Sequence, residues 1–241
     1  MLINKALDND SRLKDFVKRI FLRGVQKKQL HFLHIGKTGG TAIKYALKES
    51  HNTGTYQMHF HPHNIKLTDI AVDDKVMFVL RNPISRFISG FFSRYRQGQP
   101  RYHSPWSPAE KIAFEQFPTP NQLALALSSS DTALKGAAED AMRSIEHVRD
   151  SYWLWFDNDA YFKDRAEDVL CIGFQESLDD DFDDLRQLLG LSDAVQLPAN
   201  DLDSHRSPNG FDKHLDQHAR ENLRLWYAED YRFIELCKDL I

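Results

Sequence analysis

Residues 30–41 of the chain carry the stretch Leu30-His31-Phe32-Leu33-His34-Ile35-Gly36-Lys37-Thr38-Gly39-Gly40-Thr41. Residues 30–35 form a short, mostly apolar run, which predicts a buried β-strand. The glycines that follow predict a tight turn. A helical pattern opens at Thr41. A strand, a glycine turn and a helix in that order predict the opening of an α/β domain.

A second unit of the same kind starts at residues 76–80, which form another apolar run. The run is followed by Asn82 and Pro83, residue types that are preferred at the N-cap and at the first position of a helix. Apolar side chains then recur at helical spacing to about residue 97, namely Ile84, Phe87, Ile88 and Phe91. Two such units in succession favour a mostly parallel central sheet that is flanked by helices.

The rest of the chain continues this alternation. We expect a strand at residues 168–174 and helices at residues 109–117, 121–127, 137–147, 151–156, 182–189 and 216–240. Residues 1–28 have the spacing of an amphipathic helix, which we expect to pack on the domain as an extension. A helix that lies on a membrane surface is the alternative, because this segment is rich in lysine and arginine. We predict a single domain over residues 1–241.

The composition excludes several classes of protein. Hydrophobic residues make up 41% of the 241 residues and charged residues 27%, which is ordinary for a soluble globular protein. The net charge of −4 argues against a partner made of nucleic acid. No apolar run reaches about 18 residues, so no transmembrane segment is expected. The two cysteines have no metal-ligand spacing and fit a reducing compartment, and nothing in the sequence fixes an oligomeric state.

The glycine turn has the composition of an anion-binding loop. Glycines let backbone N–H groups approach an anion closely, and Lys37, Thr38 and Thr41 add a charge and two hydroxyl groups. The loop of nucleotide triphosphatases has its lysine after the glycines, whereas Lys37 precedes Gly39, so that template does not apply. We therefore predict a phosphate or sulfate site of another kind. The alternative is a turn with a purely structural role.

The order Lys37-Thr38-Gly39-Gly40-Thr41 after a strand resembles the 5′-phosphosulfate loop of sulfotransferases that use 3′-phosphoadenosine 5′-phosphosulfate (PAPS). It is most similar to the carbohydrate branch that includes the heparan sulfate 2-O-sulfotransferases and related bacterial proteins, in which a proline usually stands at the position of Gly36. The resemblance spans residues 32–99, with a looser likeness near Trp226 and Tyr231. It implies a P-loop-like fold and transfer of a sulfuryl group from PAPS to a hydroxyl of a carbohydrate, with 3′-phosphoadenosine 5′-phosphate (PAP) as the product.

The resemblance assigns the two ends of PAPS to the ends of two strands. It places the 5′ end on the glycine turn, at Lys37, Thr38, Gly39, Gly40, Thr41 and Ala42, with Lys37 stabilising the departing phosphate. Arg81 and Ser89 resemble the residues that hold the 3′-phosphate, and Arg206 falls in a late loop where relatives close over the cofactor. The alternatives are a surface arginine at position 81 and, at position 89, a small residue that permits close packing.

Three histidines, His59, His61 and His63, alternate between the two predicted phosphate sites. In an extended segment their side chains would share one side. A His-x-His in this interval resembles the segment that holds the catalytic base in the 2-O-sulfotransferase branch, where His63 fits best by its spacing to Arg81 and His61 is next. One alternative is that these histidines are solvent-exposed or core side chains without a chemical role. A zinc site is the other, but no cysteine or acidic residue clusters nearby, and we predict no metal.

The acceptor is expected to contact residues on either side of Arg81. His59, Arg94 and Arg96 are candidates, because arginines interleaved with tyrosines bind anionic sugars by forked hydrogen bonds and ring stacking; a solvated helix end is the alternative. We expect a soluble cytoplasmic enzyme, bacterial in origin. Two other functions stay open, namely a nucleotide-dependent kinase with an atypical loop and a catalytically inactive module that binds PAPS.

Overall fold

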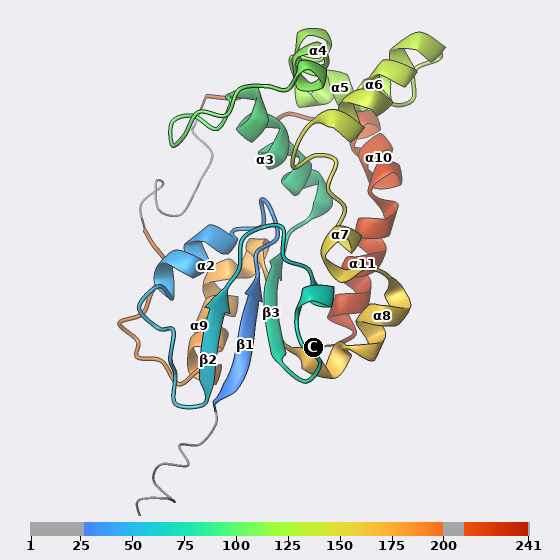
Figure 1. The fold of residues 1–241 in the computed structure, drawn as a ribbon. Helices are drawn as coiled ribbons and strands as arrows, with labels where there is room; N and C mark the ends of the chain where they lie inside the picture. The colour runs from blue at the N-terminus through green and yellow to red at the C-terminus, as the bar shows by residue number, and fades with distance from the viewer. Residues whose placement is uncertain (1–26, 200–209, 241) are drawn as a thin grey trace, which may run out of the picture.

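The computed structural model describes residues 27–199 and 210–240, and a parallel sheet forms its centre. The strands are β1 (Lys28–Leu33), β2 (Tyr56–Phe60), β3 (Lys75–Leu80) and β4 (Val169–Phe174). They pair in parallel in the order β2-β1-β3-β4, which confirms the predicted α/β class. The carboxyl ends of all the strands therefore lie along one edge of the sheet (Figure 1).

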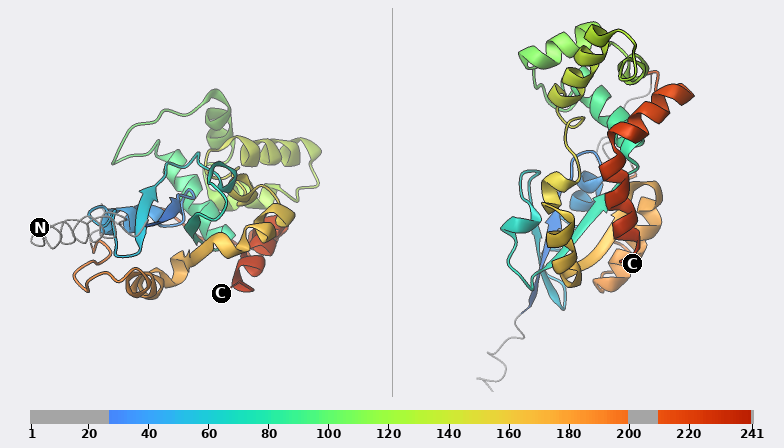
Figure 2. Two further views of the ribbon diagram at one scale, coloured as in Figure 1. Left: turned by 60° about the horizontal axis from the view of Figure 1, so that its bottom comes forward. Right: turned by 90° about the vertical axis from the view of Figure 1, so that its right-hand side faces the viewer.

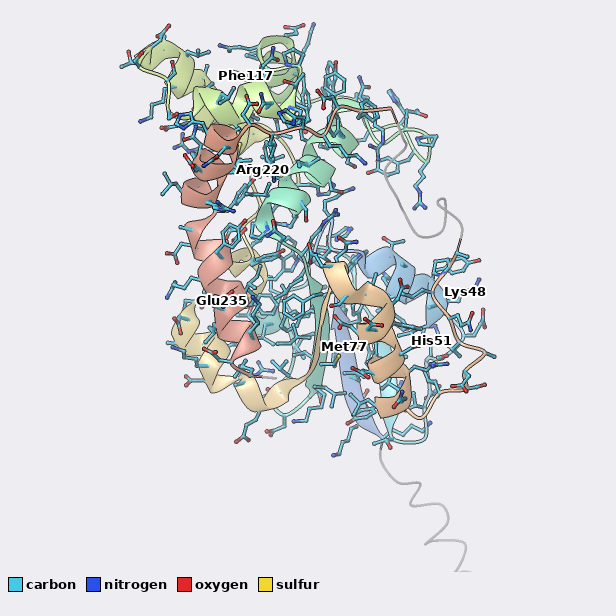
Figure 3. All side chains as sticks on the ribbon, turned by 180° about the vertical axis from the view of Figure 1, so that it is seen from behind. Lys48, His51, Met77, Phe117, Arg220 and Glu235 are labelled. Carbon is cyan, nitrogen blue, oxygen red and sulfur yellow. The ribbon has the colours of Figure 1, made fainter. Side chains whose placement is uncertain are left out.

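Helices cover both faces of this sheet. α2 (Gly40–Ala46) and α9 (Leu178–Leu188) lie on one face, where Phe32, Met77 and Phe182 are buried together. Figure 3, which views the molecule from behind, shows α9 in front of the strands beside Met77. On the other face, α7 (Trp153–Phe156), α8 (Asp159–Asp164) and α11 (Ala228–Lys238) surround Phe78. Because β3 is covered on both faces, its sequence is a nearly continuous apolar run after Lys75.

A further group of helices lies beyond the carboxyl ends of the strands (Figure 2). It consists of α3 (Pro83–Tyr95), α4 (Pro108–Gln116), α5 (Pro120–Ala126), α6 (Thr132–Ser144) and α10 (Gln217–Trp226). Their common core contains Phe87 and Phe91 of α3. Since α3 follows β3 directly and α10 leads into α11, this group and the sheet form one domain.

The start of α3 follows the predicted capping chemistry. The Asn82 side chain accepts hydrogen bonds from the backbone N–H of Ile84 and of Ser85, at 3.0 and 3.3 Å, and Pro83 is the first helical residue. This cap fixes where β3 ends and α3 begins, and so it fixes the position of Arg81 between them.

Several predicted elements needed correction. The strand β2 and the helix α8 were not predicted, and α6 begins at Thr132, before the predicted start at residue 137. The predicted helix at 216–240 is two helices that meet at Tyr227, whose buried hydroxyl donates a hydrogen bond to the backbone carbonyl of Val148 at 2.8 Å. Short 3-10 turns at Leu67–Asp69, Ala166–Asp168 and Gln175–Ser177 complete the secondary structure of the described residues.

The predicted helical extension at residues 1–28 falls almost entirely outside the described residues. Within the described part of the chain, no helix combines the length and the apolar character needed to cross a membrane. Both cysteines are free thiols, and Cys237 is fully buried.

Candidate functional site

The glycine loop leaves the carboxyl end of β1 and turns directly into α2. Gly39 has a φ of 94°, in the left-handed region that glycine tolerates best, and the next residue, Gly40, begins the helix. Gly40 also lies under the His34 ring, since a Cβ at this position would come within 2.6 Å of it. Glycine is thus required at both positions, at one by the backbone angle and at the other by close packing.

Within the described chain, the backbone N–H groups of residues 37–41 donate to no protein acceptor. These successive donors surround one turn, which is the arrangement that binds anions. The Thr38 hydroxyl donates to the backbone carbonyl of Ile35 at 3.0 Å and so stabilises the loop. Only the backbone N–H of Thr38 is left to donate to a ligand. Thr41 is half-buried at the start of α2, and Ala42 is buried behind it.

Cations gather around Lys37. Burial, and then the guanidinium groups of Arg96, Arg81 and Arg101, lower the pKa of the Lys37 amine from 10.5 to about 8. The Lys37 backbone has a left-handed φ of 70°, and its carbonyl accepts a hydrogen bond from Arg81 Nη1 at 3.2 Å. The mutual repulsion of these positive charges is relieved by an anion bound among them, so the cluster is suited to a highly charged ligand.

Arg81 is held in place at the end of β3. Its Nε donates to the Ser85 hydroxyl at 2.9 Å, and its backbone N–H donates to the Tyr152 hydroxyl at 3.0 Å. Its Nη2 is the part of the guanidinium that no described residue engages. A carboxylate oxygen of Glu176 accepts from the backbone N–H of Asn82 and from the Ser85 hydroxyl, at 2.9 and 3.1 Å.

Ser89, the predicted partner of Arg81, lies one helical turn beyond Ser85 on α3 and makes no hydrogen bond with a described residue. Ser85 was not predicted, although it lies four residues before Ser89 on α3 and therefore on the same side of the helix. Helical spacing was the signal that could have identified it.

The buried side chain of Arg86 stabilises the glycine loop. Its side chain is 2% exposed, and its Nε donates to the Gly36 carbonyl at 2.9 Å. Its Nη1 donates to the Asp150 carbonyl at 2.5 Å and lies 3.8 Å from an Asp230 carboxylate oxygen. The guanidinium therefore joins the glycine loop to the chain before α7 and to α11.

His63 lies beside the loop. Its Nδ1 is 2.7 Å from the backbone carbonyl of His34, and its ring centroid is 3.9 Å from that of His34. A carbonyl can only accept, so Nδ1 carries the proton and Nε2 of the neutral ring has a free lone pair. Desolvation lowers the pKa of His63, opposed by this backbone hydrogen bond and assisted by the charges of Lys44 and Lys37. The ring is thus neutral and basic at Nε2 near pH 7.

The rings of His59 and His61 stack with that of His31, whereas the ring of His63 contacts those of His34 and His147. The extended segment ends at Phe60, so the three rings do not share one side as an extended segment would have placed them. His61 Nε2 is 2.8 Å from His31 Nδ1, and His59 Nε2 is 2.7 Å from Gln29 Oε1. Desolvation, followed by the neighbouring His31 and His59, lowers the pKa of His61.

The two arginines predicted to bind the acceptor have different surroundings. Arg94 is 3% exposed and forms a two-pronged ion pair with Glu110, with N–O distances of 2.6 and 2.7 Å. Arg96 is half-buried, donates to the backbone carbonyls of Gln99 and Phe92, and contributes to the field at Lys37. Arg206 lies outside the described residues.

The described residues contain no group of three or more histidine, cysteine, aspartate or glutamate side chains that could hold a metal ion. The structure does bring together Lys37 from the loop after β1, His63 from the chain after β2, Arg81 from the end of β3 and Arg96 from the end of α3. His147, a residue that sequence reasoning missed, joins them from the turn after α6.

An open glycine loop and a cationic cluster at the carboxyl ends of a parallel sheet define an α/β protein that binds an anionic ligand. The model of the Sulfotransferase family matches residues 22–235, and the chain belongs to that family. It is therefore an enzyme that transfers a sulfuryl group. Comparison with the curated proteins gave no match.

Proposed function

We propose that the chain transfers a sulfuryl group from PAPS to a hydroxyl of an acceptor, most plainly a carbohydrate. The observation that carries the proposal is the run of unpaired N–H groups at residues 37–41, next to the positive charges of Lys37, Arg81 and Arg96. PAPS has two anionic ends, and this chain has donors at the ends of two adjacent strands, β1 and β3.

Each end of PAPS has its own set of proposed ligands. The 5′-phosphosulfate would bind the N–H groups of residues 37–41 and the Lys37 amine, whereas the N–H of Ala42 donates to the Gly39 carbonyl at 3.0 Å. Arg81, with Ser89 one turn beyond Ser85, would bind the 3′-phosphate, for which the Nη2 of Arg81 is available. Charge-assisted hydrogen bonds of this kind contribute about 1.5–3 kcal/mol each.

In this proposal His63 is the general base. Its Nε2 takes the proton of the acceptor hydroxyl while the new oxygen–sulfur bond forms on the far side of the sulfur from the phosphate. The sulfur–oxygen bond to the phosphate breaks in the same displacement, and Lys37 stabilises the negative charge left on that oxygen. A positioned histidine base contributes about 10²–10⁴-fold to a rate. His61 is the second candidate, but its Nε2 is already engaged by His31.

The acceptor side of the proposal rests on Arg96. Its guanidinium lies in the same cationic cluster as Lys37, so an acceptor with a negative group would be drawn toward the site. His59 stays a candidate contact for the acceptor. Arg94 is not carried into the proposal, because its guanidinium is already paired with Glu110.

The decisive experiment is calorimetric titration of the protein with PAP in the absence of magnesium. We expect PAP to bind to the wild type. Arg81→Ala should raise the dissociation constant of PAP at least tenfold, since one charge-assisted contact to the 3′-phosphate is removed. Arg143→Ala is the matched control, because Arg143 lies on the exposed surface of α6. A preference for magnesium-ATP over PAP would favour a kinase, and PAP binding without sulfuryl transfer to any acceptor would indicate an inactive binding module.

A further inference from the structure

His147 occupies an unusual place in the turn after α6. Its backbone has a φ of 67°, in the left-handed region, and the connection from α6 to α7 brings it down beside α3 (Figure 1). Two glycines make room for it. A Cβ on Gly36 would lie 3.3 Å from His147 Nδ1, and a Cβ on Gly90 would lie 3.2 Å from the backbone of His147. The ring thus lies against the glycine loop, and its backbone lies against α3.

The turn that carries His147 is fixed on both sides. The backbone N–H of Glu146 donates to the Glu110 carboxylate at 3.2 Å, and that carboxylate is paired with the buried Arg94. On the other side, the carbonyl of Val148 accepts the Tyr227 hydroxyl at 2.8 Å. The left-handed conformation is therefore held by buried contacts from α4 and from the junction of α10 and α11.

The imidazole of His147 makes no hydrogen bond with a described residue, and neither of its ring nitrogens is sealed off from solvent. Its ring meets that of His63 edge to face at 6.3 Å between centroids. Burial, and then the charge of Lys37, lower the pKa of His147 to about 3. A neutral imidazole always has one N–H to donate, and this one has no acceptor in the described protein.

We propose that His147 belongs to the transfer site and donates a hydrogen bond to the sulfuryl group as it passes from the donor to the acceptor. The inference rests on the proposed function, in which Lys37 lies at the departing oxygen and His63 at the incoming one. The His147 ring lies 6.3 Å from that of His63, between centroids, and against Gly36, the residue before Lys37, and this places it beside both groups. Being neutral, it stabilises the sulfuryl oxygens without adding a further cation to a cluster that is already crowded with positive charge.

The test compares the binding of PAPS and PAP, because only PAPS carries the sulfuryl group. Two variants keep the left-handed backbone accessible: His147→Gly removes the donor, and His147→Asn retains one. We expect His147→Gly to weaken PAPS about three- to tenfold, measured by calorimetry without acceptor, and to leave the PAP dissociation constant within about twofold. His147→Asn should restore part of the loss. His218→Ala, on α10, is the control and should change neither constant.

A second arm uses the contact with Gly36. Gly36→Ala should displace the His147 imidazole by a few tenths of an ångström and thereby lower the affinity for PAPS. The same substitution made in the His147→Gly variant should not lower the affinity for PAPS further. Equal weakening of PAPS and PAP by His147→Gly, or no weakening of either, would overturn the proposal for His147. If the wild-type protein itself binds neither ligand, the proposed function has failed instead.

Discussion

Replacing Glu110 by glutamine removes one charge from a buried ion pair that lies behind the site. Glu110 and Arg94 have side chains that are 4% and 3% exposed, and two N–O contacts join them at 2.6 and 2.7 Å. The carboxylate also accepts from the backbone N–H of Ser107 and of Glu146, so one side chain joins α3, the start of α4 and the turn before His147.

The magnitude follows from the pKa of Glu110. Burial would raise it, but the hydrogen bonds from Arg94, Ser107 and Glu146 outweigh burial and lower it from 4.5 to about 2. A fall of this size corresponds to about 3 kcal/mol of stabilisation at neutral pH. Because the pKa is lowered in the folded state, this stabilisation is present above about pH 4.5 and is lost as the pH falls toward 2. Glu110→Gln also leaves the half-exposed Glu146, 3.5 Å away, as the acidic partner of the buried Arg94, so the expected loss at pH 7 is about 3 kcal/mol.

Urea unfolding of the wild type and of Glu110→Gln, followed from pH 7 down to pH 4, measures this loss. The difference in unfolding free energy should be large at pH 7 and should narrow below about pH 4.5. Glu115→Gln is the matched control on the same helix, because Glu115 is 62% exposed in its pair with Lys111 and should change stability by less than about 0.5 kcal/mol. A loss below about 1 kcal/mol for Glu110→Gln would refute the reasoning.

Further predictions concern the transfer site. The value of kcat/KM should rise with pH to a plateau, with an apparent pKa below 6.5, because desolvation lowers the pKa of His63 and the base acts in its neutral form. The value of kcat/KM should fall again above about pH 8, where Lys37 loses its proton. If kcat/KM of His63→Gln still falls at low pH as in the wild type, the assignment of the base is contradicted. Gly40→Ala should lower the melting temperature, because the new Cβ would come within 2.6 Å of the His34 ring, whereas Gly136→Ala in the open on α6 should not. Equal melting temperatures for the wild type and Gly40→Ala would show that the loop has more room than the structure gives it.

The sequence by itself determined the framework of the site. The apolar runs of β1 and β3, the glycine loop and the cap formed by Asn82 and Pro83 are local signals, because each depends on the periodicity or backbone preference of neighbouring residues. Parallel strands then bring Lys37 and Arg81 to one edge of the sheet. The order of residues around the loop was specific enough to indicate a sulfotransferase.

Weaker local signals were misjudged. The strand β2 has the polar and apolar alternation that indicates a strand, but it is only five residues long and contains His59, so its pairing with β1 at the edge of the sheet was not predicted. The long C-terminal helix was predicted as one element, because the break at Tyr227 depends on a hydrogen bond to distant Val148 and not on a glycine or proline.

Only the tertiary structure decided which polar side chains are available for chemistry. Arg94 and Arg96 look alike in sequence, yet α4 brings Glu110 to Arg94, whereas Arg96 lies close enough to Lys37 to lower its pKa. The same packing separates His63 from His61 and brings in His147, which carries no motif. Hydrogen bonding and desolvation depend on neighbours that are distant in the chain, so residue type and spacing alone could not predict these roles.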